Sequence, residues 1–466
     1  MTSAGSHSEC EERAAKLPSG LGALLLKHFP EGGRGTVPSP RKVIIVGAGA
    51  AGLSAARVLH DCGVETVVLE ARSRLGGRIW TIHEDGVAVE MNGGYLNDLD
   101  VNALARLYKE AGWPTKWPTD PANVMDIHVN AYDAVTGDAL SLFGKLRLLY
   151  HSKRFFGGPK TRPATAQSDY PIEAWRRTYF DDSGLKGATR RLIESMFRTQ
   201  ISTDDTEKSM RWFNVLPVKG GGWVSPSQGF GAFIKTLADG LDVRVDHPVS
   251  LVSLDGETVS VSTNGDVISG SHVLITVPVA CLKAGAIDFQ PAISPMKISA
   301  VQRTGVALME KFTLLFSKPV GGRSFTTRVY YDARSGKRLT FLNFSKYAGR
   351  PMVVAYAHTD YAAKFVTHGR EEREVIVIQA LRDVLNDPTL KPDRVFQSNW
   401  TDDPNSRGAY SYIKANEGPE LIRTLEEPEF GGRLLFAGEA TDVSRHSTVD
   451  GAVATGVREA RRLLNI

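Results

Sequence analysis

One stretch decides the fold: Lys42-Val43-Ile44-Ile45-Val46-Gly47-Ala48-Gly49-Ala50-Ala51-Gly52, followed at once by Leu53–Leu59. The apolar run 42–46 predicts a buried strand, and the spacing of the apolar residues over 53–59 predicts a helix. A second apolar run, Thr66–Leu69, predicts the next strand and ends at Glu70. A strand, a glycine turn, a helix and a strand within about thirty residues make up a βαβ unit.

The glycines of this turn have the G-x-G-x-x-G spacing that binds the pyrophosphate of a dinucleotide. Gly47 permits the tight turn, Gly49 leaves room for a phosphate, and Gly52 lets the helix and the strand pack closely. The helix N-terminus adds N–H donors and the positive end of its dipole. Glu70 is placed to accept hydrogen bonds from both ribose hydroxyls. The same carboxylate would repel a 2′-phosphate, which argues against NADP.

The composition restricts the class of protein further. The chain has 466 residues, of which 42% are hydrophobic and 23% charged, and its net charge is +4. These values are typical of a folded globular protein of two or three domains, and the absence of a basic tract gives no support for a nucleic-acid partner. We find no apolar run of about 18 residues that would cross a membrane. The three cysteines form no CxxC pair, so we expect no metal site and a cytoplasmic location.

The rest of the chain alternates between two kinds of segment. We expect a leader over residues 1–40, with a short amphipathic stretch at Leu21–His28. Residues 41–97, 241–299 and 400–466 are expected to form the dinucleotide-binding domain, and residues 98–240 and 300–399 a second domain. The periodicity predicts further helices over Val101–Ala111, Ile172–Phe180, Lys186–Phe197, Arg373–Leu385 and Gly451–Leu463. It predicts further strands over Val243–Val245, Val259–Ser262, Val273–Val277, Phe312–Phe316, Met352–Tyr356 and Leu434–Ala437.

Two further blocks favour FAD over NAD as the dinucleotide. Leu75–Thr81 follows Glu70 closely and contains two more glycines and Arg78, which suits a second pass beside the pyrophosphate. Phe436–Thr441 places Glu439 directly after a strand, where its carboxylate would suit the hydroxyls of a ribityl chain. An NAD-dependent dehydrogenase would share the first glycine motif and nothing after it.

Together these blocks resemble the flavin-containing amine oxidases, the family of monoamine, polyamine and L-amino-acid oxidases and the related histone demethylases. The resemblance runs from about Lys42 to Leu464 and is strongest at the two ends and over 243–320. It implies an α/β fold in which a Rossmann-like FAD-binding domain is interleaved with an α+β substrate-binding domain, as in glutathione-reductase-like proteins. It also implies transfer of hydride from the carbon beside an amine nitrogen to flavin N5. The resulting imine would hydrolyse, and oxygen would be reduced to hydrogen peroxide.

The resemblance also implies roles for individual residues. Lys311 matches the lysine that holds a water at flavin N5, although a lysine on an exposed strand face would be the simpler explanation. Tyr410, ten residues after Trp400, matches one wall of an aromatic cage, which would favour a neutral amine; a buried core aromatic is the alternative. These two are the expected catalytic residues. The substrate is expected to contact Tyr95, Asn97, Tyr410 and Thr448. The expected FAD-binding residues are Gly47, Gly49, Ala51, Gly52, Glu70, Ala71, Arg72, Gly76, Gly77, Arg78, Gly93, Gly94, Tyr95, Val249, Trp400, Gly438, Glu439, Thr448 and Val449.

The sequence departs from the family at three positions. Ala409 stands where monoamine oxidases have the cysteine that bonds to flavin, so we expect noncovalent FAD. Thr448 stands at the second cage tyrosine, which admits a longer or bulkier substrate. Asn97 replaces a histidine of the polyamine oxidases, and Tyr95 stands at the aromatic position before it, so the polyamine interpretation is weakened.

Two alternatives and several partner questions stay open at this point. An L-amino-acid oxidase, or a tailoring oxidase of a nitrogen-containing secondary metabolite, would keep the chemistry and change the substrate. An amino acid would need a cation for its carboxylate, most naturally an arginine. The candidates are Arg190, Arg191, Arg198 and Arg211. A flavin-binding interaction protein without turnover is the alternative from another class, and Lys311 argues against it. The expected partners are a small-molecule amine and molecular oxygen, with no nucleic acid and no membrane, and a homodimer is left open.

Overall fold

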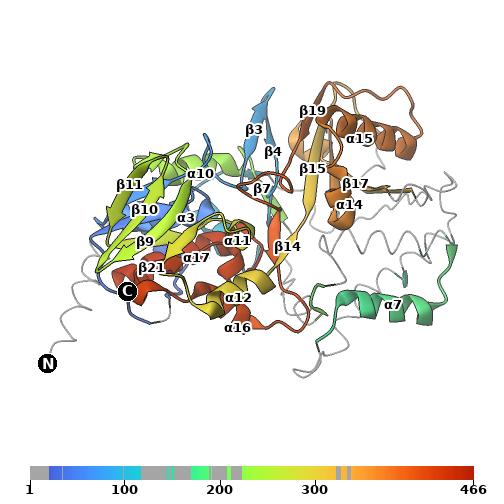
Figure 1. Cartoon of the computed structure of the whole chain (residues 1–466). Helices are drawn as coiled ribbons and strands as arrows, with labels where there is room; N and C mark the ends of the chain where they lie inside the picture. Colours follow the sequence, from blue (N-terminus) through green and yellow to red (C-terminus); the bar gives the residue numbers. More distant parts are fainter. Residues whose placement is uncertain are drawn as a thin grey trace.

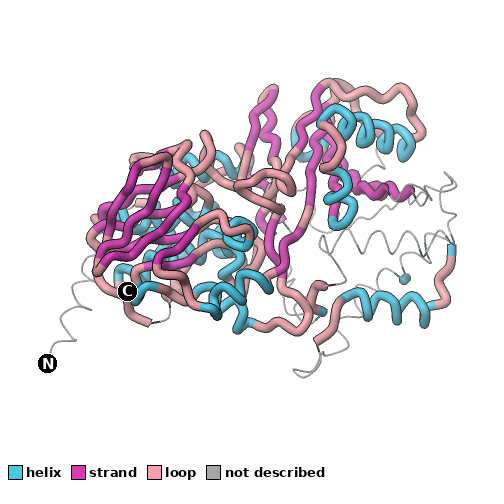
Figure 2. The backbone as a smooth tube through the Cα atoms, viewed as in Figure 1, coloured by secondary structure: helices cyan, strands magenta, loops and turns pink. Residues whose placement is uncertain are grey.

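A computed structural model of the chain describes residues 20–33, 35–97, 99–116, 143, 146, 150–151, 169–187, 190, 207–210, 223–321, 327–332 and 337–466. Two regions stand out in it (Figure 1). In the region at the left, helices and strands are intermixed, and in the region at the right a separate sheet is covered by helices (Figure 2). The expected glycine turn lies in the first region.

The first region is built on a five-stranded sheet in which every pair of neighbours is parallel. Its strands come from the three segments 41–97, 241–299 and 400–466. Because all the strands run the same way, their carboxyl ends meet at one edge of the sheet. The strand order is β21 (Leu434–Phe436), β12 (His272–Ile275), β1 (Lys42–Val46), β2 (Glu65–Leu69) and β8 (Val243–Arg244).

Both faces of this sheet are buried, which explains the unbroken apolar run of β1. On one face Val43 and Ile45 pack in a core with helices α3 (Ala50–Asp61) and α17 (Val449–Leu464). On the other face Ile44 and Val46 pack against a second, mostly antiparallel sheet. That sheet has the order β11 (Asp266–Gly270), β10 (Thr258–Thr263), β9 (Val249–Asp255) and β13 (Asp288–Gln290).

Glycines allow the two helices of this core to approach other backbone closely. A Cβ on Gly52 of α3 would lie 2.0 Å from the carbonyl oxygen of Gly47, and a Cβ on Gly456 of α17 would lie 2.1 Å from that of Ala51. Real Cβ atoms do not approach a backbone oxygen so closely, so only glycine fits at both positions. The N-terminus of α3 is therefore pressed against both β1 and α17.

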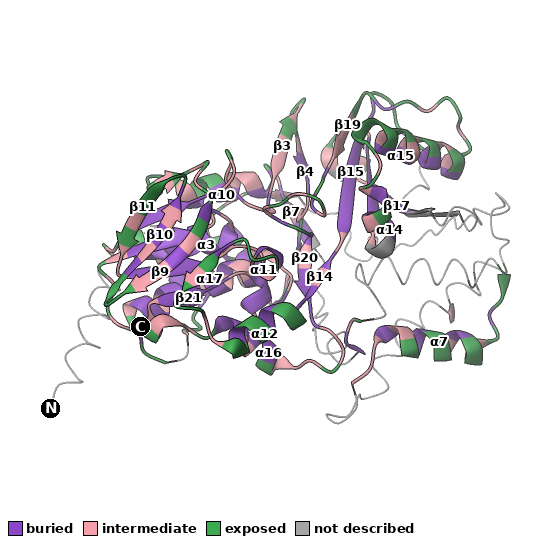
Figure 3. Cartoon of the chain, in the orientation of Figure 1, coloured by how far each residue is buried: buried purple, intermediate pink, exposed green. Residues whose placement is uncertain are grey.

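The second region contains a five-stranded antiparallel sheet from the segment 300–399. Its interior strand β15 has all seven residues buried and is drawn in purple in Figure 3. The strand order in this sheet is β16 (Thr327–Asp332), β17 (Lys337–Asn343), β18 (Met352–His358), β15 (Met309–Leu315) and β19 (Arg394–Gln397). Helices α14 (Thr359–Phe365) and α15 (Arg370–Leu385) pack against it.

Short strands and further helices make up the rest of the described structure. Two strand pairs are β14 (Gly305–Ala307) with β20 (Tyr410–Tyr412) and β3 (Thr81–Glu84) with β4 (Val87–Glu90). A three-stranded sheet has the order β5 (Leu96–Asn97), β7 (Trp223–Pro226) and β6 (Thr115–Lys116). The remaining helices are α4 (Ala103–Glu110), α7 (Ile172–Ser183), α10 (Phe230–Ala238), α11 (Val279–Lys283), α12 (Pro295–Arg303), α13 (Ser345–Ala348), α16 (Pro419–Glu426), η1 (Phe430–Gly432) and η2 (Glu439–Thr441).

Residues 21–28 form a helix, α2 (Leu21–His28), within the segment predicted as a leader. Leu25 and Leu26 are buried in the same core as α3 and α17. Arg461 of α17 donates to the backbone oxygens of Leu26 and Phe29. The ordered core therefore begins before the boundary drawn at residue 40. The helix predicted over Lys186–Phe197 lies mainly outside the described residues.

We predict that Gly52→Ala destabilises the apoprotein by about 3 kcal/mol or more, because the added carbon meets a backbone oxygen that the fold holds in place. Gly49→Ala is the matched control. The nearest atom that a Cβ on Gly49 would meet lies 4.0 Å away, so that variant should lose no more than about 1 kcal/mol. Urea unfolding of both variants measures the difference, and equal losses would contradict the close approach of α3 to β1.

Candidate functional site

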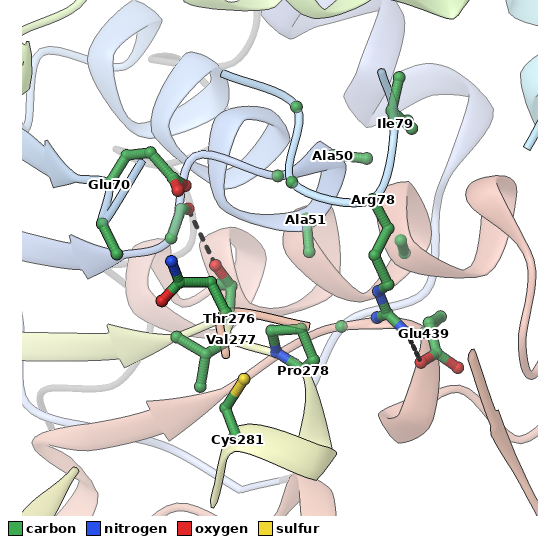
Figure 4. Close-up of a pocket in the computed structure, with 18 of the residues that line it drawn as sticks. Ala50, Ala51, Glu70, Arg78, Ile79, Thr276, Val277, Pro278, Cys281 and Glu439 are labelled. Atoms are coloured by element: carbon green, nitrogen blue, oxygen red, sulfur yellow. Dashed lines mark hydrogen bonds and ion pairs between the residues drawn. The ribbon is translucent and has the colours of Figure 1, made fainter. Parts of the chain in front are cut away.

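A cleft lies at the carboxyl edge of the parallel sheet, where β1, β2, β12 and β21 end. Its empty space is about 1360 Å³, open solvent at its mouth included. Parts of the chain far apart in sequence contribute to the walls, among them Glu70, Thr276–Pro278 and Glu439 (Figure 4). Sixteen of the residues predicted from the sequence line it: Gly47, Gly49, Ala51, Glu70, Ala71, Arg72, Gly76, Gly77, Arg78, Gly93, Val249, Tyr410, Gly438, Glu439, Thr448 and Val449.

The glycine turn between β1 and α3 forms the floor of the cleft. Gly47 has a φ of +109°, which an L side chain rarely adopts, and a Cβ there would lie 2.8 Å from Thr276 Oγ1. A Cβ on Gly49 would have no neighbour nearer than Gly76 O at 4.0 Å, so its missing side chain leaves the cleft clear. No side chain caps the N-terminus of α3, and no acidic residue lies in its first turn. The backbone thus presents donors and the positive end of the helix dipole to an anionic group.

Glu70 closes one end of the cleft and is held by backbone donors. Its Oε2 accepts from Ala48 N at 2.9 Å, and its Oε1 accepts from Arg72 N at 3.0 Å. The guanidinium of Arg72 lies 3.8 Å from the same carboxylate and pairs with Asp403 at 2.9 Å. The carboxylate is therefore fixed in the wall as an acceptor, as a site for ribose hydroxyls requires.

Arg78 and Glu439 form an ion pair across the cleft (Figure 4). Arg78 Nη1 lies 3.0 Å from Glu439 Oε1 and also donates to Ala409 O at 3.2 Å. Burial by itself would raise the pKa of Glu439, but Arg78, His446 and the Ser411 hydroxyl outweigh that effect and lower the pKa below its usual value. Glu439 is therefore ionised at neutral pH, and the cleft contains a fixed carboxylate beside a guanidinium.

Lys311 lies on the interior strand β15, with only 5% of its surface exposed. Its Nζ donates to Asn92 O at 3.2 Å, and a Cβ on Gly94 would lie 3.7 Å from the same nitrogen. Burial lowers the pKa of Lys311 to about 8, and the carboxylate of Glu90 opposes this shift. The lysine is therefore buried beside the loop that contains Gly93, a cleft residue, and does not lie on an exposed strand face.

Tyr410 lies on β20, which pairs with β14 through Ala307. It lines the cleft together with Thr448 and Val449 at the start of α17. Thr448 caps that helix by accepting from Gly451 N at 3.0 Å. The threonine at the expected second cage position is thus a helix cap in the wall of the cleft.

Several predicted residues lie outside the cleft walls. Gly52 packs against the backbone of the glycine turn, as described above, and a Cβ on Gly94 would lie 3.3 Å from the Cβ of Glu90. Trp400 is 2% exposed and donates its Nε1–H to Met91 O, so it supports the loop after β4 from behind. Tyr95 is 42% exposed. Asn97 accepts from Asn102 through its backbone oxygen, and its side chain is exposed. Lys311 reaches the edge of the site only through the backbone of the Asn92–Gly94 loop.

Other cleft residues were not singled out from the sequence. Thr276 donates to the backbone oxygens of Val46 and Gly47 and so holds the glycine turn. Asn92 supplies the oxygen that Lys311 contacts, and its side chain donates to Ala409 O at 3.2 Å. Cys281 and Ser447 also line the walls. The signal for Thr276 is its place directly after a predicted buried strand, whereas nothing local marks the other three.

The described part of the chain contains no group of three or more His, Cys, Asp or Glu side chains placed to hold a metal ion. Among the same residues, no helix combines the length and apolar character needed to span a membrane.

Comparison with known sequences identifies the family. The sequence model of the flavin-containing amine oxidoreductases matches residues 50–464. The chain belongs to this family. It is 28% identical to human lysine-specific histone demethylase 2, over 91% of this chain and 53% of the demethylase. It is 26% identical to polyamine oxidase 5 of Oryza sativa subsp. japonica, over 94% of this chain and 89% of the oxidase. The chain thus spans about half the length of the demethylase and most of the length of the polyamine oxidase.

Solved structures agree in fold. The structure of putrescine oxidase bound to putrescine superimposes on this chain with a TM-score of 0.69 at 21% sequence identity. The match covers 91% of this chain and 99% of the putrescine oxidase chain. A double mutant of the same enzyme gives a TM-score of 0.72 at 20% identity over the same shares. The predicted fold class, an α/β amine oxidase fold with a Rossmann-like domain, is confirmed.

We predict that Arg78→Met destabilises the protein by about 2–3 kcal/mol at pH 7, because it leaves the Glu439 carboxylate buried without its cation. The pKa of Glu439 is lower in the folded protein than in the unfolded chain. The ion pair therefore stabilises the fold fully at pH values above the pKa of Glu439 in the unfolded chain. This contribution is lost as the pH falls through the pKa of Glu439 in the folded protein. The difference between variant and wild type should therefore shrink toward pH 4. Urea unfolding across this pH range measures it.

The double variant Arg78→Met/Glu439→Gln is the control, since its cleft contains neither charge. It should recover most of the stability that Arg78→Met loses at pH 7. A loss that stays constant with pH, or that the second substitution leaves unchanged, would contradict the pairing.

Proposed function

We propose that this protein is an amine oxidase that holds FAD noncovalently in the cleft and uses oxygen as its electron acceptor. The observation that carries the proposal is the composition of one cavity. Its walls combine the opening glycine turn, Glu70, the Arg78–Glu439 pair and the start of α17, and Lys311 is buried directly behind the loop at one side. A single dinucleotide with a redox-active ring fits this order of groups.

The residues present fit FAD in their donors and acceptors. The uncapped N-terminus of α3, with Gly47 and Gly49, and the guanidinium of Arg78 would hold the pyrophosphate. Glu70 would accept the ribose hydroxyls, and Glu439 the ribityl hydroxyls. Ala409 lines the cleft with no atom that could bond to the ring, which supports noncovalent binding.

Bound FAD would supply the hydride acceptor for the carbon beside the amine nitrogen and would return the electrons to oxygen as hydrogen peroxide. The chain's own residues would bind and orient the amine. Tyr410 presents an aromatic wall in a partly apolar cleft, where desolvation favours the neutral amine over the ammonium form. The neutral form is the one that can release hydride from its α-carbon. The product imine then hydrolyses in water without help from a nucleophilic side chain.

Lys311 is proposed to hold a water molecule at the edge of the site. Its ammonium or amine group is buried, contacts only one backbone oxygen among the described residues, Asn92 O, and lies 5.7 Å from the centre of the Tyr356 ring. With a pKa of about 8, the group can carry or release a proton near neutral pH. It can therefore assist proton transfer when oxygen is reduced.

The substrate is proposed to be an amine longer or bulkier than a simple monoamine, since Thr448 leaves one cage wall small. The amino-acid alternative gains no support from Arg190, the one candidate arginine among the described residues. Its guanidinium lies over the Phe180 ring at 5.1 Å and 4.0 Å from Asp181. The other candidates, Arg191, Arg198 and Arg211, lie outside the described residues.

The purified protein is expected to be yellow and to release its flavin into solution on denaturation with acid, because no covalent bond holds it. Anaerobic addition of primary, secondary and tertiary amines, polyamines and L-amino acids tests the substrate class by loss of flavin absorbance, and a peroxide assay in air tests the acceptor. Bleaching by an amine with no peroxide formed would contradict oxygen as the acceptor. A yellow protein that none of these compounds bleaches would favour the interaction protein without turnover.

We predict that Lys311→Met slows reoxidation of the reduced enzyme by oxygen at least tenfold and slows reduction by the amine by less than twofold. In the wild type, the reoxidation rate should change with an inflection near pH 8, where Lys311 titrates, and this inflection should vanish in the variant. Stopped-flow measurement of each half-reaction tests this.

Lys297→Met is the matched control, because Lys297 is an equally buried lysine whose Nζ donates to Leu425 O and Glu427 O at the end of α16. It should lower the melting temperature and leave the ratio of the two half-reactions unchanged. Equal slowing of both half-reactions by Lys311→Met would remove the proposed role.

A further inference from the structure

We propose that His446 is a positioning residue of the cofactor cleft. It donates a hydrogen bond to Ser411, and Ser411 in turn holds the Glu439 carboxylate in the orientation that accepts hydroxyl groups of the bound nucleotide. This inference rests on the proposed FAD site and goes beyond it, since neither the histidine nor the serine lines the cleft among the described residues.

The three side chains form a short hydrogen-bonded chain inside the protein. His446 Nε2 lies 3.0 Å from Ser411 Oγ, and Ser411 Oγ lies 2.6 Å from Glu439 Oε2. The Ser411 backbone N–H adds a second bond, to Glu439 Oε1 at 3.3 Å. All three residues are at most 7% exposed. Solvent is therefore poorly placed to replace a partner that is removed.

The direction of the protons follows from the chemistry of the groups. Glu439 is ionised, so its carboxylate can only accept. The Ser411 hydroxyl has one proton, and the shorter distance and the negative charge assign that proton to Glu439. Ser411 Oγ can then only accept from His446, so the imidazole must carry its proton on Nε2. The tautomer of the histidine and the direction of the serine hydroxyl are therefore coupled.

This chain also connects the three segments that form one wall of the cleft. Ser411 follows the cleft residue Tyr410 on β20, and His446 precedes the cleft residues Ser447 and Thr448. Ser447 Oγ donates to Ser411 O, and Ser447 N donates to Glu439 O. A defect at His446 would therefore be transmitted to the carboxylate in the wall.

The remaining acceptor capacity of Glu439 shows why its orientation matters. Oε1 is contacted by Arg78 and by the Ser411 amide, whereas the Ser411 hydroxyl is the only hydrogen-bond partner of Oε2 among the described residues. A carboxylate oxygen can accept two hydrogen bonds. One position on Oε2 is thus left for a hydroxyl of the nucleotide, provided that Ser411 keeps donating to the same oxygen.

The test compares two variants of equal size, His446→Gln and His446→Met. The glutamine amide can place an N–H where the imidazole Nε2–H lies, and methionine has the same length without a donor. The affinity of the apoprotein for FAD is measured by quenching of flavin fluorescence. We expect the FAD Kd of His446→Met to rise about tenfold, because the loss of one buried hydrogen bond to a charged network weakens binding by about this factor. The Kd of His446→Gln should stay within twofold of wild type.

A double-mutant cycle separates positioning from packing. In a Glu439→Gln background, His446→Met should change the FAD Kd by less than twofold, because the carboxylate that it orients is gone. His272→Met is the control for a buried histidine, since His272 lies at the opposite end of β12 from the cleft and contacts Ser271 Oγ. Its Kd should also stay within twofold of wild type.

The outcomes are distinct. A wild type that does not bind FAD would overturn both the cofactor proposal and this one. Two outcomes with a wild type that binds FAD would overturn the role of His446 alone. In the first, His446→Met binds FAD as tightly as the wild type. In the second, His446→Met causes the same tenfold loss of affinity in the Glu439→Gln background.

Discussion

The structure depends on one close approach of backbone to backbone. Helix α3 begins against the end of β1, with Gly52 facing the carbonyl of Gly47, and α17 crosses the same helix with Gly456 facing the carbonyl of Ala51. These contacts press the N-terminus of α3 and the start of α17 toward the same edge of the parallel sheet. The cleft exists because no side chain separates these elements, and both helix N-termini therefore face it.

The walls of the cleft contain charged groups that the fold can bury only because each has a partner. Glu70 is held by two backbone N–H groups and Arg72, and Glu439 by Arg78 and Ser411. Removing charge from water is costly, so such groups are positioned by their partners before any ligand arrives. Lys311 is the contrasting case. It is buried beside a single backbone oxygen among the described residues, and its pKa falls to about 8. A site that combines preorganised acceptors with one easily titrated base is well suited to redox chemistry on an amine.

The local pattern predicted the βαβ unit well. The strand 42–46 has the bounds expected. The helix after the glycines starts earlier than expected, because its first turn begins within the glycine motif at Ala50, and it ends two residues later, at Asp61. Most of the residues that the resemblance assigned to FAD binding line the cleft, since they lie in motifs at strand ends. Trp400 could not be assigned in this way. Its indole packs behind the loop after β4, and an aromatic residue in a motif has the same sequence pattern whether it faces a ligand or a core.

The sequence by itself determined the fold family, the glycine turn and the acidic residues at the ends of β2 and β21, because these depend on local periodicity and on backbone geometry that only glycine can adopt. The tertiary structure decided which distant groups meet. The pairing of Arg78 with Glu439, the placing of Lys311 beside Asn92 and the chain from His446 to Glu439 join segments separated by tens to hundreds of residues. No periodicity specifies such pairs, since they arise from the order of strands in the sheets and from the need of buried charges for partners.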